Sequence, residues 1–102
     1  LELMITGDVI GAREAERIGL VTRVVPDEDV LKVSLDLARR IAQGPTIAID
    51  FIKRAAYRGL FNTLDEQLDF ESYAQNVCRG TEDHREGVAA FQEKRPPRFR
   101  GL

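Results

Sequence analysis

Glycine and proline residues divide the chain into short segments, and their spacing constrains the fold more than any other feature of the sequence. Glycine commonly ends a helix because it adopts the left-handed conformation at little cost, and proline cannot continue a helix. The breaks fall at Gly7, Gly11, Gly19, Pro26, Gly44, Pro45, Gly59, Gly80, Pro96 and Pro97. We therefore expect a series of short elements separated by turns.

Four helices are predicted after residue 26, because apolar residues recur there at helical spacing. Their expected ranges are 27–43, 45–58, 64–79 and 82–95, followed by an extended tail. The residues expected to face inward are Leu31, Leu35, Ala38 and Ala42, then Ala48, Phe51 or Ile52, Ala55 and Ala56, then Leu64, Leu68, Ala74, Val77 and Cys78, and finally Val88 and Phe91. Lys53, Arg54 and Arg58 are expected on the opposite side of the second helix.

The first 26 residues are expected to contain a helix end, a short helix and one strand. The helix end is stopped by Gly7, and Gly11 and Gly19 bound the short helix. The β-branched run at residues 20–25 is the only convincing strand, although a lone strand needs a partner and this chain offers none. The fold prediction is therefore mostly α, with one short strand near residues 20–25 and a division into residues 1–26 and 27–102.

Composition excludes several classes of function. Fifteen basic and 17 acidic residues nearly cancel, so the net charge of -2 gives no electrostatic footprint for nucleic acid. The longest uncharged run, Ile41 to Ile49, is interrupted by Gly44 and Pro45 and is far too short to span a bilayer. A single cysteine, Cys78, forms no intrachain disulfide and fits a reducing compartment. We expect a cytoplasmic protein with neither a nucleic-acid nor a membrane partner.

No complete active site can be assembled from these residues. One histidine and one cysteine are too few for a standard zinc site, and no phosphate-binding glycine loop occurs. His84 is expected on the solvated surface, and Cys78 is expected to be a buried, inert thiol. The acidic residues of the third helix are spaced like a solvated face. The sequence therefore predicts neither a catalytic residue nor a metal ligand.

Two stretches of the sequence carry more information than the isolated polar residues. In residues 3–26 the informative groups are Thr6-Gly7, Glu14-Ala15, Gly19-Leu20-Val21 and Val24-Val25-Pro26. In residues 81–99 they are Asp83, Glu86-Gly87, Ala90-Phe91, Glu93-Lys94-Arg95, Pro97 and Phe99. Together these stretches closely resemble the enoyl-CoA hydratase/isomerase family, also called the crotonase superfamily. Gly11 departs from the Ser or Thr cap more usual there.

This resemblance implies the helical C-terminal region of an α/β crotonase-type fold, in an enoyl-CoA hydratase (a lyase) or isomerase. The family's catalytic carboxylates and its enolate-stabilising pair of backbone N–H groups lie upstream of the matched region. The isolated chain is therefore expected to be inactive. The resemblance also implies an acyl-CoA substrate, with coenzyme A as part of that substrate and no other cofactor required, and a homo-oligomer, either a trimer or a hexamer.

By motif position, the resemblance assigns CoA binding to Phe91 and Lys94. An aromatic face suits an adenine ring, and an ammonium group suits a phosphate. The alternative interpretation makes Phe91 a core residue and Lys94 a solvated charge at a helix end. For the chain as a whole, the alternative is a free-standing helical module for protein–protein interaction without catalysis.

Overall fold

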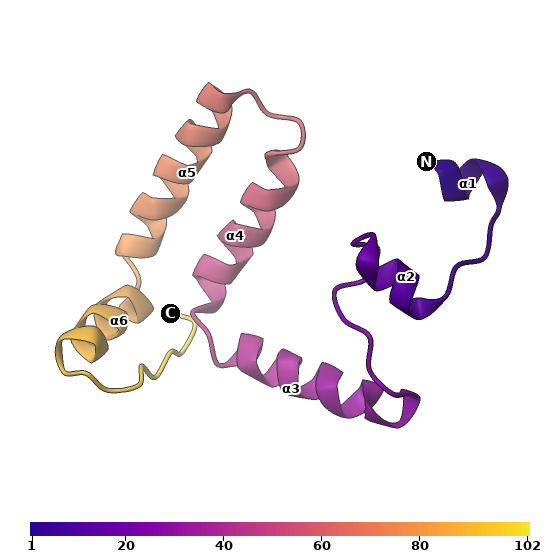
Figure 1. Ribbon diagram of the computed structural model, residues 1–102. Helices are drawn as coiled ribbons and strands as arrows, with labels where there is room; N and C mark the ends of the chain where they lie inside the picture. The colour runs from indigo at the N-terminus through magenta and orange to yellow at the C-terminus, as the bar shows by residue number, and fades with distance from the viewer. The chain divides into compact units, whose positions relative to one another are not determined.

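The computed structural model describes residues 1–102, which form six α-helices, one short 3-10 helix and no strand (Figure 1). The elements are α1 (Glu2–Thr6), α2 (Ala12–Arg17), η1 (Asp27–Asp29), α3 (Val30–Ala42), α4 (Thr46–Arg58), α5 (Leu64–Arg79) and α6 (Glu82–Gln92). The mostly helical prediction is confirmed, and each predicted helix has its counterpart. The chain divides into two compact units, Leu1–Ser34 and Leu35–Leu102. The predicted division of the chain after residue 26 stays a prediction.

The strand predicted at residues 20–25 is wrong, since this segment is irregular in the structure. A strand is stable only when its backbone groups pair with a neighbouring strand, and this chain supplies none. Some of those groups bond to α2 instead. The N–H groups of Leu20 and Val21 donate to the Ala15 carbonyl oxygen at 2.8 and 3.3 Å. The Val24 N–H donates to Glu16 Oε1 at 3.0 Å.

Glycine geometry explains why the helices of the first unit are short. Gly7 follows α1 with a φ of 70°, a left-handed conformation that favours glycine, and its N–H donates to the Leu3 carbonyl oxygen. Gly19 adopts a φ of 77° just after α2. Ala15 is the only buried apolar residue of this unit.

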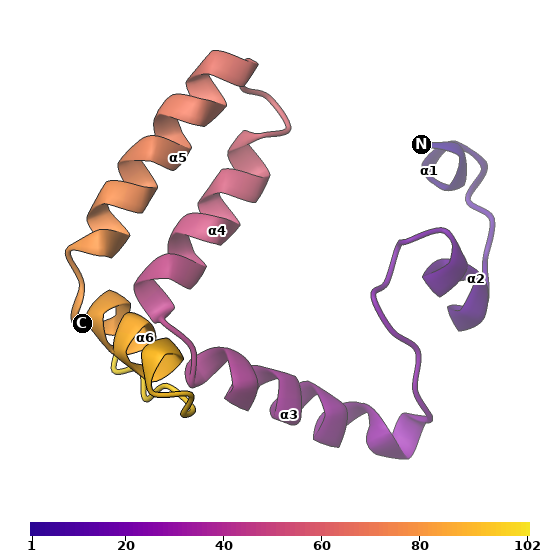
Figure 2. The same ribbon diagram turned by 60° about the vertical axis from the view of Figure 1, so that its left-hand side comes forward.

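In the second unit, α4 and α5 form a helical hairpin whose arms lie side by side (Figure 2). Its core is aromatic. The Phe51 and Phe70 rings are buried with their centroids 6.1 Å apart, and the Tyr73 ring meets Phe51 edge-on at 5.9 Å. Such arrangements are favourable beyond the area that they bury.

Two sequence expectations about this hairpin need correction, and one open choice is decided. Arg54 and Arg58 do not face away from the core, because their guanidinium groups lie 5.2 Å from the Phe51 ring centroid and 4.4 Å from that of Phe70, respectively. Leu64 and Leu68 are exposed rather than inward-facing. The undecided position resolves to Phe51, since Ile52 is exposed.

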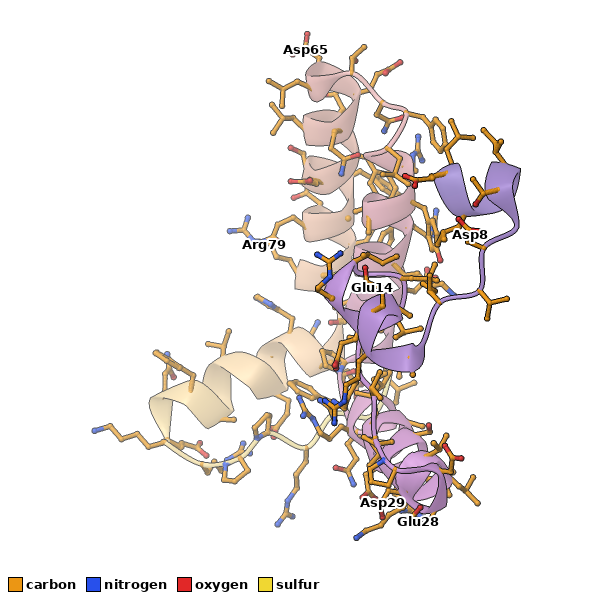
Figure 3. The ribbon with its side chains drawn as sticks, turned by 45° about the vertical axis from the view of Figure 1, so that its right-hand side comes forward. Asp8, Glu14, Glu28, Asp29, Asp65 and Arg79 are labelled. Carbon is orange, nitrogen blue, oxygen red and sulfur yellow. The ribbon has the colours of Figure 1, made fainter.

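Charges and caps fix the ends of α5. Asp65 lies in its first turn and Arg79 in its last, so both complement the helix dipole (Figure 3). The Thr63 hydroxyl oxygen accepts from the Glu66 N–H, and the Glu66 carboxylate accepts from the Thr63 N–H at 2.8 Å, which forms a complete capping box. Glu66 therefore has a structural role, and these hydrogen bonds hold the pKa of its carboxyl below the usual value.

Thr81 sets the turn between α5 and α6, which pack against each other. Its hydroxyl accepts from the His84 N–H at 3.0 Å and donates to the Cys78 carbonyl oxygen at 2.7 Å. After α6, residues 93–102 (the tail) turn back and run alongside this helix (Figure 1). The tail and α6 carry the second sequence motif.

Candidate functional site

An apolar groove lies between α6 and the elements packed around it, with a volume of about 340 Å³. Its walls come from the start of α4, the end of α5, one side of α6 and the tail. The lining residues are Pro45, Ile47, Ala48, Cys78, Thr81, Asp83, His84, Gly87, Val88, Phe91 and Phe99. The groove thus brings together Phe91, which the sequence singled out for CoA, and Phe99, which it did not.

Phe91 is 86% exposed, so within this chain it is not a core residue. The interpretation of Phe91 as a core residue therefore does not hold within this chain. The core position in that turn belongs to its neighbour Ala90, which is 2% exposed. An aromatic ring held in solvent at the rim of an apolar groove is available to a flat ligand or to a partner chain.

Lys94 lies three residues beyond Phe91, just past the end of α6. Its φ of 53° is left-handed, and it is the only residue other than glycine with a positive φ. Its N–H donates to the Phe91 carbonyl oxygen at 3.3 Å, and the Arg95 N–H donates to that of Ala90 at 3.0 Å. The exposed ammonium and the exposed ring therefore belong to one turn.

Two carboxylates of α6 bind the tail, and the sequence analysis missed both roles. Glu86 accepts from the Arg95 guanidinium at 2.6 and 2.9 Å, and its Oε1 also accepts from the Arg98 N–H at 2.7 Å. Asp83, only 3% exposed, accepts from the N–H groups of Arg100 and Gly101 at 2.7 and 2.9 Å. A buried carboxylate is stable when hydrogen bonds satisfy its oxygens in this way.

Gly87 lies beside Glu86 on the side of α6 that faces the Phe99 ring of the tail. A Cβ atom at this position would lie 3.6 Å from the Phe99 ring. The Glu-Gly pair of the motif therefore has a physical meaning. Its carboxylate binds the tail backbone and a tail guanidinium, and its glycine lies against the tail's aromatic ring.

The Glu86 carboxyl is strongly stabilised in its ionised form. Arg95, and then the Arg98 N–H, lower its pKa from the usual 4.5 to about 2. The other charged groups around it are Glu82 and Asp83 on α6 and Arg98 and Arg100 on the tail. The same ion pair raises the pKa of Arg95, which stays protonated under all ordinary conditions.

This shift predicts acid-induced release of the tail. Because the folded-state pKa of Glu86 is lowered, its stabilising contribution is complete above pH 4.5 and is lost as the pH falls towards about 2. The protection factor of the Arg98 amide, which corrects its exchange rate for the pH dependence of intrinsic exchange, should therefore fall over this range. Glu86→Gln, which does not ionise, should exchange faster at neutral pH and lose most of the acid dependence. An identical pH profile in both proteins would contradict this assignment.

Two further side chains, His84 and Cys78, lie largely where the sequence placed them. His84 is exposed, and Cys78 is half-buried in the groove wall. No group of three or more His, Cys, Asp or Glu side chains is arranged to hold a metal ion. No helix has both the length and the apolar composition needed to cross a membrane.

Comparison with known proteins places the chain in a family of CoA-ester enzymes. The model of the enoyl-CoA hydratase/isomerase family matches residues 1–101. A 1,2-epoxyphenylacetyl-CoA isomerase from Escherichia coli (strain K12) is 39% identical over 97% of this chain and 38% of its own length. A crotonyl-CoA hydratase from Syntrophomonas wolfei is 40% identical over 96% of this chain and 38% of its own length.

The solved structures agree with the sequence comparison. The crystal structure of an enoyl-CoA hydratase from Bacillus anthracis superposes with a TM-score of 0.91 at 37% identity, over 99% of this chain and 39% of that one. The chain belongs to the enoyl-CoA hydratase/isomerase family, as its motifs indicated. It spans about 38% of the length of the curated relatives that it matches.

Proposed function

We propose that this chain forms the C-terminal CoA-binding and assembly region of an enzyme that converts acyl-CoA thioesters through an enolate. The observation that carries the proposal is the C-terminal end of α6, where the 86% exposed Phe91 lines an apolar groove and the exposed Lys94 follows three residues later, just past the helix. Membership of the enoyl-CoA hydratase/isomerase family supplies the class of reaction.

The two side chains suit two different parts of CoA. The Phe91 ring offers a flat apolar face for an adenine ring, and the Lys94 ammonium offers hydrogen bonds and charge to a phosphate. Lys94 has no carboxylate partner among the ion pairs of the structure, so its charge is available. In this proposal CoA is part of the substrate, and no further cofactor takes part.

The catalytic groups are assigned to the part of the family fold outside this chain. An enolate next to a thioester needs backbone N–H donors aimed at the developing oxyanion and a positioned carboxylate. Asp83, the carboxylate that lines the groove, is already bound to the tail backbone. The chain's own contribution is therefore binding rather than chemistry.

An activity assay tests this division of roles. The intact protein that carries this chain should hydrate or isomerise a short enoyl-CoA, followed by loss of the absorbance of the conjugated thioester. The purified 102-residue chain should match the buffer blank. Turnover by the isolated chain that survives removal of contaminating full-length enzyme would contradict the assignment.

The assembly role rests on the apolar surface. Only four apolar residues are buried, namely Ala15, Phe51, Phe70 and Ala90. Large apolar side chains such as Leu31, Leu35, Ile52 and Leu64 are exposed. Exposed apolar surface on this scale favours burial against the rest of the fold or against other subunits. The proposal includes a homo-oligomer, either a trimer or a hexamer, because the family resemblance implies one.

The isolated chain should therefore self-associate at roughly tens of micromolar, because its apolar surface lacks cover. Light scattering should give a mass above the 11.5 kDa of one chain. Hydrogen exchange should find the helices after Asp27 better protected than the residues before Gly19. A compact monomer with uniform protection would contradict the assembly role.

A further inference from the structure

Lys94 occupies a backbone conformation that it does not prefer. A left-handed φ of 53° is uncommon for any residue with a Cβ atom, and such a conformation persists only when surrounding contacts impose it. The next residue, Arg95, is fixed by the two-pronged ion pair with Glu86, whose carboxylate comes from an earlier turn of α6. The turn of Lys94 is therefore held both by the hydrogen bonds that end α6 and by the ion pair that fixes Arg95 to an earlier turn of the helix.

Phe99 is fixed in a related way, through both of its neighbours. The N–H of Arg98 donates to Glu86 at 2.7 Å, and that of Arg100 donates to Asp83 at 2.7 Å. The ring between them lies over Gly87 and lines the same groove as Phe91. The turn that carries Lys94 and the position of the Phe99 ring thus both depend on Asp83 and Glu86, two carboxylates of α6 that bind the tail.

We propose that Asp83 and Glu86 are positioning residues for CoA binding, because by holding the tail against α6 they set the turn that carries Lys94 and the wall that Phe99 gives to the Phe91 groove. This inference rests on the proposed function of Phe91 and Lys94. Neither carboxylate contacts CoA in this proposal, and both act through the tail backbone and through Arg95.

The test uses Glu86→Gln and Asp83→Asn, singly and together, in the intact protein that carries this chain. Both substitutions preserve side-chain shape and remove charge. CoA affinity measured by calorimetry should fall roughly tenfold in the double variant, as expected for losing charge-assisted hydrogen bonds that preorganise a site. KM for acyl-CoA should rise with little change in kcat.

Glu93→Gln is the matched control. Glu93 also pairs with Arg95, at 2.5 Å, but it lies on the tail side of the turn and does not connect the tail to an earlier turn of α6. Its loss should leave CoA affinity near that of the wild type. Amide exchange at Arg98, Arg100 and Gly101 reports tail release directly, and exchange in α4 and α5 verifies that the fold is intact. If the double variant is unfolded, Glu86→Gln alone carries the comparison.

A thermodynamic cycle separates positioning from general destabilisation. In a Lys94→Ala background the loss of Asp83 and Glu86 should cost clearly less CoA affinity than in the wild type, since one of the groups that they position is already gone. A fully additive effect would overturn the inference. So would an unchanged CoA affinity in the double variant, whether or not its tail is released.

The inference and the proposed function fail in different ways. If Phe91→Ala and Lys94→Ala weaken CoA binding but the double carboxylate variant does not, the inference is wrong and the proposed function stands. If Phe91→Ala and Lys94→Ala leave CoA affinity unchanged, the proposed function fails, and the inference that rests on it fails too.

Discussion

Phe70→Ala should destabilise the folded chain by about 3 kcal/mol, near the lower end of the usual range for deleting a buried phenylalanine. Phe70 is 7% exposed and shares the hairpin core with Phe51. Its ring also carries the Arg58 guanidinium at 4.4 Å, so the substitution removes a cation–π contact as well. The hairpin has no second buried layer to compensate, because Phe51 and Phe70 are its only buried apolar side chains.

Phe61→Ala is the matched control for this prediction. Phe61 lies in the turn between α4 and α5 and is 89% exposed, so the same change of residue removes almost no buried area. Urea unfolding followed by circular dichroism should give a midpoint near that of the wild type. The measurement needs a concentration at which dilution no longer moves the midpoint, because association stabilises the folded state. Equal destabilisation by both substitutions would contradict the aromatic core.

In the intact protein, Phe91→Ala and Lys94→Ala should each raise KM for an acyl-CoA and change kcat less. Each substitution should cost about 1–3 kcal/mol of binding, which corresponds to roughly 5- to 150-fold in affinity. The effect should fall on KM because groups that bind the distant end of CoA interact equally with the substrate and with the transition state. Steady-state kinetics with a short enoyl-CoA give both constants.

Conservative variants distinguish a ligand contact from a merely structural effect. Phe91→Tyr retains the aromatic face and should keep most of the affinity, and Lys94→Arg retains the charge. Lys53→Ala removes an exposed lysine from α4, away from the proposed turn, and should have no effect on KM. If kcat falls while KM holds in Phe91→Ala, the binding role is contradicted.

Local features of the fold could be predicted from the sequence. Thr63 and Glu66 are three residues apart, so their capping box is visible in the sequence, and Gly44, Gly59 and Gly80 separate the helices as expected. The strand at residues 20–25 could not be judged in this way. Its β-branched residues favour a strand, but a strand forms only when a neighbouring strand is present, and this chain supplies none. Backbone N–H groups of this segment donate instead to residues of α2.

The candidate site was less accessible to sequence reasoning. The motif placed Phe91 correctly on α6, and spacing alone suggested that it faces inward with Val88, whereas both are exposed. The buried residue of that turn is Ala90, so the side of α6 that faces inward is not the side that carries Val88 and Phe91. The roles of Asp83 and Glu86 depend on partners 9 to 18 residues away across a turn, which no helical periodicity reveals.

Calorimetric titration with CoA, comparing the intact wild-type protein with its Phe91→Ala Lys94→Ala double variant, tests the central claim most directly. The account predicts saturable binding by the wild type and an affinity lower by at least roughly tenfold in the double variant, with unchanged helical content. Equal affinities for CoA in the two proteins would show that the last turn of α6 is not the CoA contact, and the account would be wrong at its centre.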